Sequence, residues 1–460
     1  MSNTPAETLS PLLTQTDRLS ISEAGDLMID GCTALELVAQ YGSPLFAISE
    51  QTFRDNLRRF RRAFESHWPE PINVMFAIKS NNSFALRAIA NEEGAGGDCF
   101  GIGELACTLR GGCDPSKIAL NGSYKSDEAL KVAIDAGIAV HLDSMEEIDD
   151  VVRVARELNK KVRVGLRLKV LPEAYFSELQ SDHYPQPGRF IDAMARLKWG
   201  VKADLAVDII NRTKEIDELE FYGFHTHLGR VSNDPTAFAE LYREYARMIG
   251  DIYQRTGVAP FMVDLGGGWP RERDPESRTQ ERNPHGIENY AKQVCQVIQE
   301  EFNAIDMPLP QLWLEPGRYI TGNSGVLLSS VGLIKREENQ TWVNIDASSY
   351  LMIMVETLGA KNHVTVASGM HRPYTQRADV VGPICIPSIF ELDSQLPDIE
   401  RGEVMAILDA GHYCESQASQ FNSMPRPATV LINDGQAEII RQRETLDDVL
   451  ASQRVPARLA

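Results

Sequence analysis

A lysine ends a short apolar run, VMFAIK, which spans Val74 to Lys79. Lysine is seldom buried without a purpose, because removing its charge from water costs free energy. One interpretation is a lysine that bonds covalently to a carbonyl carbon, with an amine pKa lowered by its surroundings. A lysine that emerges into solvent where the run ends is an equally good interpretation of Lys79 taken alone.

Three consecutive glycines, Gly266, Gly267 and Gly268, follow another apolar run in FMVDLGGG. Because glycine has no side chain, backbone N–H groups in such a segment can approach an anion such as phosphate closely. A plain tight turn explains the three glycines equally well.

The segment LEPGR places Glu315, Gly317 and Arg318 together. A carboxylate here can keep a cofactor's ring nitrogen protonated, although a simple Glu–Arg ion pair is the alternative. His227, in HTHLGR, can pack flat on a cofactor ring or can be an ordinary core histidine. Taken together, an amine, an anion cradle and a carboxylate describe a pyridoxal 5′-phosphate pocket.

Short apolar runs alternate with segments of helical periodicity between about residues 70 and 320. The runs cover residues 74–79, 96–100, 117–121, 139–144, 162–168, 221–229, 261–268 and 312–318. Eight strands, each followed by a helix, predict a (β/α)₈ TIM barrel over residues 46–320. Groups at the carboxyl ends of barrel strands face the active site, and these ends carry Lys79, Asp98, Asn121, Asp143, Arg167, His225, His227, Gly266–Gly268 and Glu315–Arg318.

The remaining parts of the chain have a different pattern of apolar residues. Residues 321–460 contain strand-like runs separated by turns, such as TWVNID, ADVVGPICI and EVMAILD, which predict a mostly antiparallel β domain. The N-terminal segment 1–45 contains LSISEAGDLMIDG, two short strands around a turn, and is expected to join that β domain. Residues 171–200 form a long connection rich in aromatic residues, which we expect to be a flap over the barrel mouth.

Composition excludes several classes of protein. The net charge is 46 − 65 = −19 over 460 residues, which argues against a nucleic-acid partner. No run approaches the roughly 20 apolar residues that span a membrane, and the first thirty residues carry no signal-peptide pattern. The seven cysteines lack paired spacing, so neither a disulfide framework nor a zinc site is expected. These features predict a cytoplasmic protein without a metal ion.

The chain resembles the fold-type III pyridoxal-phosphate decarboxylases in the order of its motifs. These motifs are AIKSN, GGDCFGIGEL, HTHLGR, DLGGGWP, LEPGR, GPIC, DAGHY and SQFN. The similarity runs from about residue 35 to residue 450, and LKWG (197–200) is similar to the diaminopimelate branch in particular. The resemblance implies a barrel plus a C-terminal β domain, an amino-acid substrate, and a homodimer with shared active sites.

The resemblance also implies roles for individual residues. Lys79 is implied to bond to the cofactor, and Asp98 and Glu104 match an acidic pair. The implied cofactor-binding set is Lys79, Asp98, His227, Gly266, Gly267, Gly268, Glu315, Gly317, Arg318 and Tyr413. The implied catalytic residues are Lys79, His227 and Cys385, with Cys385 delivered from the neighbouring subunit to protonate the carbon that has lost CO₂. Burial alone would make Cys385 a small hydrophobic residue.

The chain departs from the family pattern at three positions that bear on the substrate. Ile386 follows the cysteine where the group has Glu or Asp for the substrate's distal ammonium, and Met354 aligns with an arginine that holds the distal carboxylate. Arg230 replaces a phosphate-contacting serine, so with Arg318 and Ile386 it is expected to meet the substrate or the phosphate; a solvated arginine is the alternative.

We therefore predict a decarboxylase that acts on an α-amino acid with altered recognition of the distal group. A true meso-diaminopimelate decarboxylase is the first alternative, if an acidic residue of the 171–200 segment (Glu173, Glu178 or Asp182) supplies the missing contact. An amino-acid racemase and a non-catalytic homologue that binds the cofactor are two others. Racemases of this fold place an arginine at the pyridine nitrogen, so Glu315 favours the decarboxylase.

Overall fold

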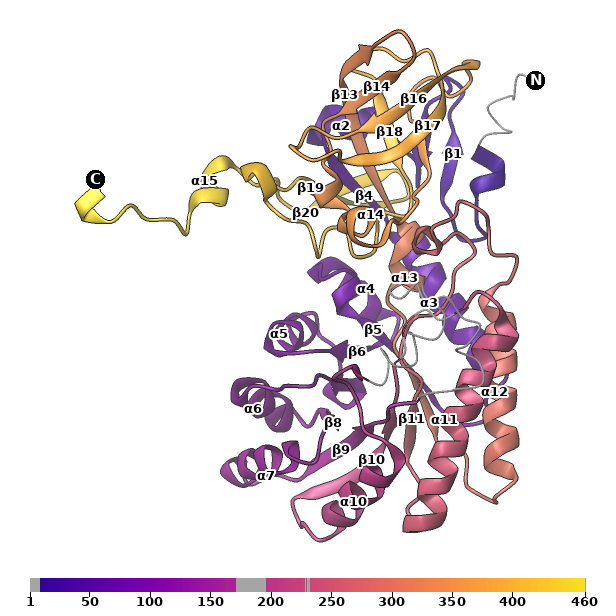
Figure 1. The fold of residues 1–460 in the computed structure, drawn as a ribbon, viewed down its shortest axis with the longest axis vertical. Coiled ribbons are helices and arrows are strands. Elements are labelled where there is room, and N and C mark those ends of the chain that lie inside the picture. Colours follow the sequence, from indigo (N-terminus) through magenta and orange to yellow (C-terminus); the bar gives the residue numbers. More distant parts are fainter. Residues whose placement is uncertain (1–8, 171–195, 228, 230–231, 460) are drawn as a thin grey trace. The chain divides into compact units, whose positions relative to one another are not determined.

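The computed structural model describes residues 9–170, 196–227, 229 and 232–459 (Figure 1). These residues form two compact units, which we describe separately. The barrel unit comprises Asn56–Glu272 and Asn283–Ile320. The β unit comprises the N-terminal residues up to Asp55, Arg273–Arg282, and the chain from Thr321 onward. Most of the predicted flap, with Glu173, Glu178 and Asp182, lies outside the described residues, as does Arg230.

The barrel unit is built on a closed sheet of parallel strands in the order β10-β11-β12-β5-β6-β7-β8-β9. The strands are β5 (Ile72–Ala77), β6 (Gly96–Cys99), β7 (Ile118–Leu120), β8 (Ala139–Leu142), β9 (Val162–Arg167), β10 (Leu219–His225), β11 (Met262–Asp264) and β12 (Gln311–Leu314). Each strand lies within or overlaps one of the predicted apolar runs. The prediction of a (β/α)₈ barrel is therefore confirmed.

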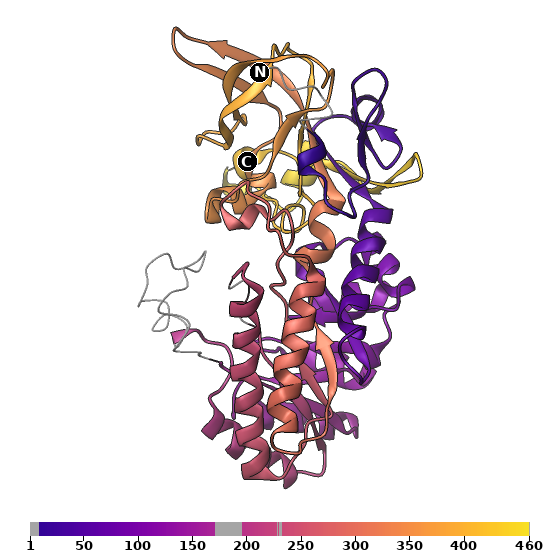
Figure 2. The same ribbon diagram turned by 90° about the vertical axis from the view of Figure 1, so that its right-hand side faces the viewer.

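A helix follows each barrel strand. These helices are α4 (Phe84–Glu92), α5 (Ile102–Arg110), α6 (Asp127–Ala136), α7 (Glu147–Leu158), α10 (Ala203–Lys214), α11 (Pro235–Thr256), α12 (Ile287–Asn303) and the short α13 (Arg318–Thr321). Figure 1 shows α4 to α7 on the outside of the barrel strands, and Figure 2 shows α11 and α12 side by side. The sequence specifies their ends: at α6, the Ser126 hydroxyl accepts the N–H of Ala129 (3.2 Å), and Gly137 ends the helix at φ 76°.

The barrel interior changes from apolar to polar along its axis. One buried cluster within it consists of Met75, Ala119, Ala139, Tyr222, Met262 and Trp313. Toward the carboxyl ends of the strands, ionisable side chains replace this apolar layer. Gly165 makes room for one of them, because a Cβ there would lie 2.4 Å from Cδ2 of His141.

The β unit contains a sheet in the order β17-β16-β14-β13-β4-β19-β20, with β18 pairing to β13 and β15. Its strands are β4 (Leu45–Ser49), β13 (Gly325–Arg336), β14 (Thr341–Ile345), β15 (Val364–Val366), β16 (Tyr374–Val381), β17 (Ile389–Pro397), β18 (Val404–Ile407), β19 (Ala428–Asn433) and β20 (Gln436–Arg441). Only β14–β16 and β4–β19 are parallel among the described strand pairs of this sheet. The prediction of a mostly antiparallel domain is confirmed.

The N-terminal hairpin is also present. Strands β1 (Leu19–Ile21) and β2 (Leu27–Ile29) pair antiparallel around the predicted turn, and β3 (Cys32–Thr33) adds to β2. The other α-helices are α2 (Ala34–Tyr41), α3 (Glu50–Glu65), α14 (Ile353–Leu358) and α15 (Leu446–Leu450). In the described part of the chain, no helix combines the length and the apolar character needed to cross a membrane.

One strand prediction needs correction. The run ADVVGPICI suggests that a strand extends through Cys385, but β16 ends at Val381. Pro383 has no N–H to donate to a neighbouring strand, and the N–H of Gly382 turns back to the carbonyl of Ser388 (2.8 Å). Cys385 therefore lies in a loop.

Candidate active site

Lys79 lies in a 3₁₀ turn (Ile78–Ser80) directly after β5. Its Nζ donates to Oδ2 of Asp98, which is the last but one residue of β6 and is 1% exposed. The aromatic ring of Phe100 lies beside the same amine, with its centroid 5.8 Å from Nζ. The structure thus brings the predicted lysine and the predicted carboxylate together at the carboxyl ends of adjacent strands.

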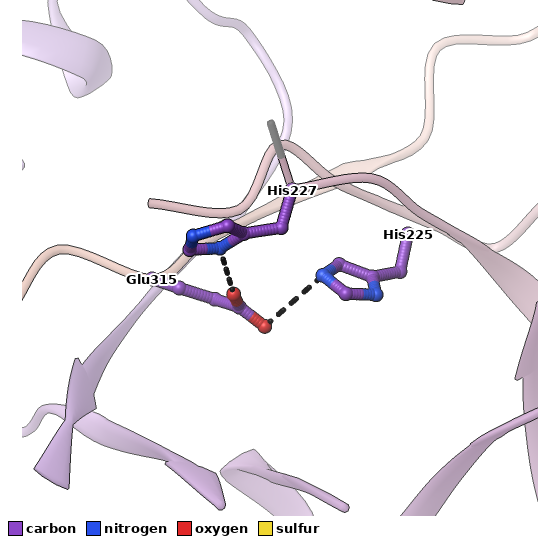
Figure 3. A group of neighbouring side chains, drawn as sticks. All are labelled: His225, His227 and Glu315. Atoms are coloured by element: carbon purple, nitrogen blue, oxygen red, sulfur yellow. Dashed lines mark hydrogen bonds and ion pairs between the residues drawn. The ribbon is translucent and has the colours of Figure 1, made fainter. Parts of the chain in front are cut away.

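Glu315, which follows β12, is 2% exposed and is surrounded by hydrogen-bonding groups. Oε1 accepts from Nδ2 of Asn121 (2.6 Å) and lies 3.4 Å from Nε2 of His225. Oε2 lies 3.0 Å from Nδ1 of His227 (Figure 3). The carboxylate is therefore held in place from two sides.

The pKa values of the carboxyl groups in the site are shifted in opposite directions. Burial opposes ionisation of Glu315, but His225, His227 and Lys79 together hold its pKa well below the usual value. Glu104, in the first turn of α5, behaves oppositely: burial, and then the charge of Asp98, raise its pKa to about 7. Burial also lowers the pKa of His227, so this ring is neutral at neutral pH.

The predicted glycine cradle follows β11 and is tightly packed. A Cβ on Gly266 would lie 2.3 Å from the carbonyl oxygen of Thr226, and one on Gly267 would lie 2.5 Å from that of Glu315. Gly266 and Gly268 have φ of +66° and +87°, in the region that glycine favours. Only glycine fits this turn without displacing its neighbours.

The N–H groups of the cradle are partly engaged with the protein. Gly266 donates to Oδ1 of Asp264 (2.8 Å), and the backbone nitrogen of Gly267 lies 3.0 Å from Nδ1 of His227, the ring nitrogen that also faces Oε2 of Glu315. Gly317, after β12, packs closely as well, because a Cβ there would lie 3.0 Å from that of Ser80. These contacts hold the glycine turn against the site. The turn therefore shapes the site in addition to offering N–H donors.

A cationic side chain joins the site from β9. Arg167 is 6% exposed, and its Nη2 donates to the carbonyl of His227 (3.1 Å). Burial lowers the pKa of Arg167, although Asp143 and Glu315 oppose that change.

The other predicted residues lie in the β unit. Cys385 is exposed and its N–H donates to Oδ1 of Asn422 (3.3 Å), while Ile386 beside it is half-buried. Tyr413 has φ 51° and contacts the ring of His412 edge to face, with centroids 5.7 Å apart. Met354 lies half-buried in α14.

Two residues without a predicted role are central to the site. Asn121 and His225 lie at strand ends, the positions that the barrel prediction marks, but nothing in their local sequence identifies a partner. His225, His227 and Glu315 also place one ligand atom each within 4.8 Å of one another, a spacing that a metal ion could use.

Comparisons with known proteins identify the family. Residues 50–322 match the model of the pyridoxal-dependent decarboxylase, pyridoxal binding domain. The chain is 32% identical to diaminopimelate decarboxylase of Methanothermobacter thermautotrophicus over 442 residues, which covers 96% of this chain and 98% of the relative. It is 28% identical to diaminopimelate decarboxylase of Aquifex aeolicus over 93% of this chain and 95% of the relative.

Solved structures agree with these sequence matches. Diaminopimelate decarboxylase from M. jannaschii superposes with a TM-score of 0.87 at 27% identity, covering 96% of this chain and 99% of that one. A second structure of that protein, in complex with L-lysine, gives 0.87 at 26% identity and covers 97% and 100%.

Proposed function

The chain belongs to the pyridoxal-dependent decarboxylases, and from that premise we propose that it removes the α-carboxylate of an amino acid whose distal group is not cationic. The family establishes the cofactor, pyridoxal 5′-phosphate, and the reaction class, a carboxy-lyase. The preference for a distal group without positive charge depends on Ile386.

The residues of the barrel unit fit this cofactor. A pyridine ring, an aldehyde and a phosphate each require particular groups, and the site has them. They are an amine next to a buried carboxylate, a second buried carboxylate with two histidines, and a glycine turn with no room for a Cβ. Lys79, His227, Glu315, Gly266–Gly268, Gly317 and Arg318 would hold it, and Tyr413 is proposed to meet the phosphate. When bound, pyridoxal 5′-phosphate supplies the electron sink for the pair left behind by CO₂.

The protein's own groups then have distinct tasks. Glu315, whose pKa is held low, is ionised and holds a proton on the ring nitrogen. Asp98 keeps the Lys79 amine oriented through the bond to Oδ2, and neutral His227 offers an uncharged ring face. Cys385 returns a proton to the α-carbon after CO₂ has left.

The distal preference follows from the residue next to Cys385. An ammonium placed against Ile386 without a partner would lose its hydration, and an unpaired buried charge costs several kcal/mol. A difference of that size lowers kcat/KM by orders of magnitude. We therefore expect meso-diaminopimelate, lysine and ornithine to be poor substrates, and a neutral or acidic side chain to be preferred.

A second candidate is a true diaminopimelate decarboxylase. Both the relative that is 32% identical and the structure with a TM-score of 0.87 carry that name, and one such structure is a complex with L-lysine. In that case an acidic group other than the residue after Cys385 must take the distal ammonium.

Steady-state kinetics distinguishes the two candidates. We expect CO₂ release from amino acids with neutral or acidic side chains and a kcat/KM for meso-diaminopimelate far below about 10⁴ M⁻¹s⁻¹, an ordinary value for a natural substrate. A value above that limit would overturn the distal preference. Ile386→Glu should raise diaminopimelate turnover selectively, Lys79→Ala serves as the inactive control, and racemised substrate without CO₂ would indicate a racemase.

We also infer a homodimer in which Cys385 of one subunit serves the site of the other. Cys385 is the exposed cysteine in a set that is otherwise buried or half-buried. A thiol exposed on one chain is accessible to a second copy, which is consistent with a shared site.

A further inference from the structure

We infer that Asn121 is a positioning residue that holds Asp98 and Glu315 in one fixed arrangement, so that the amine end and the ring end of the site are ordered together. The inference rests on the proposed function only in identifying these two carboxylates as cofactor partners. The hydrogen bonds themselves stand on the geometry of the barrel.

Asn121 spans the two carboxylates with one amide group. Its Nδ2 donates to Oδ1 of Asp98 (2.7 Å) and to Oε1 of Glu315 (2.6 Å). An amide NH₂ carries two hydrogens, so both bonds can form at once. The other oxygen of Asp98 accepts from Lys79, and the other oxygen of Glu315 faces His227. Asn121 therefore connects the lysine side to the histidine side.

The orientation of the amide is determined by its surroundings. Rotating it by 180° would place Oδ1 against two carboxylate oxygens, which is repulsive. In the orientation described, Oδ1 lies 2.8 Å from Nδ1 of His141, so that nitrogen must carry a hydrogen and donate it. Burial lowers the pKa of His141 well below its usual value, which is consistent with this neutral ring.

The positions of Asn121 and His141 are restrained in turn. The N–H of Asn121 donates to the carbonyl of Cys99 (2.7 Å), and its side chain is buried with the residue only 1% exposed. The ring of His141 fills the space over Gly165 and stacks on His225, with centroids 5.1 Å apart and planes 28° apart. Asn121 is thus held at both its backbone and its amide oxygen.

This arrangement matters because the carboxylates of Asp98 and Glu315 share a buried space, where like charges repel. Displacing either group would remove the partner of Lys79 or the partner of the ring nitrogen. Two N–H donors from one neutral group stabilise both charged forms and add no positive charge that would compete with Lys79.

The test compares Asn121→Asp with the wild-type holoenzyme. The variant keeps the shape but replaces the shared donor with a third acid, and added negative charge raises the pKa of a neighbouring cationic nitrogen. We expect the pH midpoint of the bound cofactor's visible absorbance to rise by about one unit or more. We expect kcat to fall by about tenfold or more and KM to change much less.

Asn73→Asp is the matched control. Asn73 lies at the amino end of β5, the opposite end of that strand from Lys79, and its Nδ2 donates to the carbonyl of Lys117 (3.2 Å). This variant should titrate as the wild type does. A purely structural role for Asn121 predicts lower thermal stability in Asn121→Asp with an unchanged midpoint, and that result would overturn the inference.

Asn121→Ser provides a second variant if Asn121→Asp does not fold. Serine has one hydroxyl hydrogen and can serve only one carboxylate at a time, so its absorbance midpoint should also move; an unchanged midpoint overturns the inference. These absorbance readouts do not depend on the substrate. A shifted midpoint in a protein that releases CO₂ from no amino acid would therefore support Asn121 and contradict the proposed function.

Discussion

At the scale of single residues, the site separates carboxyl groups by their environment. Glu315 is ionised because histidines and Lys79 face it, whereas Glu104 and Asp264 are pushed toward the protonated form by burial and by neighbouring carboxylates. The same side-chain chemistry therefore supplies both charged and neutral groups within one barrel mouth. Each environment leads to a different pH dependence.

We expect Glu104 to titrate near neutral pH. Its pKa is raised to about 7, and the charge of Lys79 is among the groups that it senses. Above that pH an ionised Glu104 stabilises a proton on the Lys79 nitrogen. The absorbance of the bound cofactor should therefore show an inflection near pH 7 that Glu104→Gln removes. An inflection that persists in the variant would assign it to another group.

We expect the stability difference between Asp264→Asn and the wild type to depend on pH. It is fully buried, Oδ1 accepts from Gly266, and burial followed by the charge of Glu315 raises its pKa well above the usual value. The folded protein thus keeps a proton that the unfolded chain releases above about pH 4, so this residue's contribution to stability falls as pH rises. Asp264→Asn mimics the protonated form. Its Tm relative to wild type should increase from pH 4 to pH 8.

Asp409→Asn serves as the control, because here the amide is expected to lower stability at neutral pH and not to raise it. Asp409 is 1% exposed and pairs with the buried guanidinium of Arg273, so the amide removes one carboxylate partner of that charge and leaves Asp17. Its Tm should fall at neutral pH. If Asp264→Asn also lost stability as pH rose, the assignment of a protonated Asp264 would be wrong.

At the scale of elements, the glycine turn after β11 connects the fold to the site. A Cβ on Gly267 would lie 2.5 Å from the carbonyl oxygen of Glu315 and 2.9 Å from Cε1 of His227. Gly267→Ala should therefore displace both site residues and lower cofactor affinity by about tenfold or more, because contacts of this length cannot be relieved locally. Cofactor binding to the apo protein, followed by absorbance, measures the change.

Gly103→Ala is the matched glycine control. Gly103 lies in α5, and apart from its chain neighbours and its own helix backbone no atom lies within 4 Å of a Cβ built there. Alanine in a helix is favoured over glycine by about 0.5–1 kcal/mol, so this variant should be slightly more stable and bind cofactor normally. Equal loss of affinity in both variants would show that the turn is not special.

Elements were the most predictable level of this protein. All eight barrel strands lie within or overlap the apolar runs, because a strand buried on both faces has a continuous apolar sequence. β17 (Ile389–Pro397) does not stand out, since several of its residues are exposed and polar. The role of Asn121 could not be derived from sequence, because its carboxylate partners lie 23 and 194 residues away.

At the scale of the whole molecule, the proposed catalytic, cofactor-binding and substrate residues are divided between the two units of the chain. Lys79, Asp98, His227 and Glu315 belong to the barrel unit, and Cys385, Ile386 and Tyr413 belong to the β unit. A homodimer with shared sites would combine Lys79 of one subunit with Cys385 of the other. The chain would then be inactive as a single copy, however well it folds.

Mixing inactive variants tests this assembly. In a hybrid of Lys79→Ala and Cys385→Ala subunits, one site receives both substitutions and the other receives none. Random exchange makes about half of the dimers hybrids, so activity should return to roughly a quarter of the wild-type value. The double variant Lys79→Ala/Cys385→Ala mixed with wild type is the control, because there every hybrid carries one substitution in each site and contributes nothing. If each site used a single chain, the first mixture would stay inactive and the wild-type site in the control hybrids would remain active, which would exclude Cys385 as a residue supplied by the second subunit.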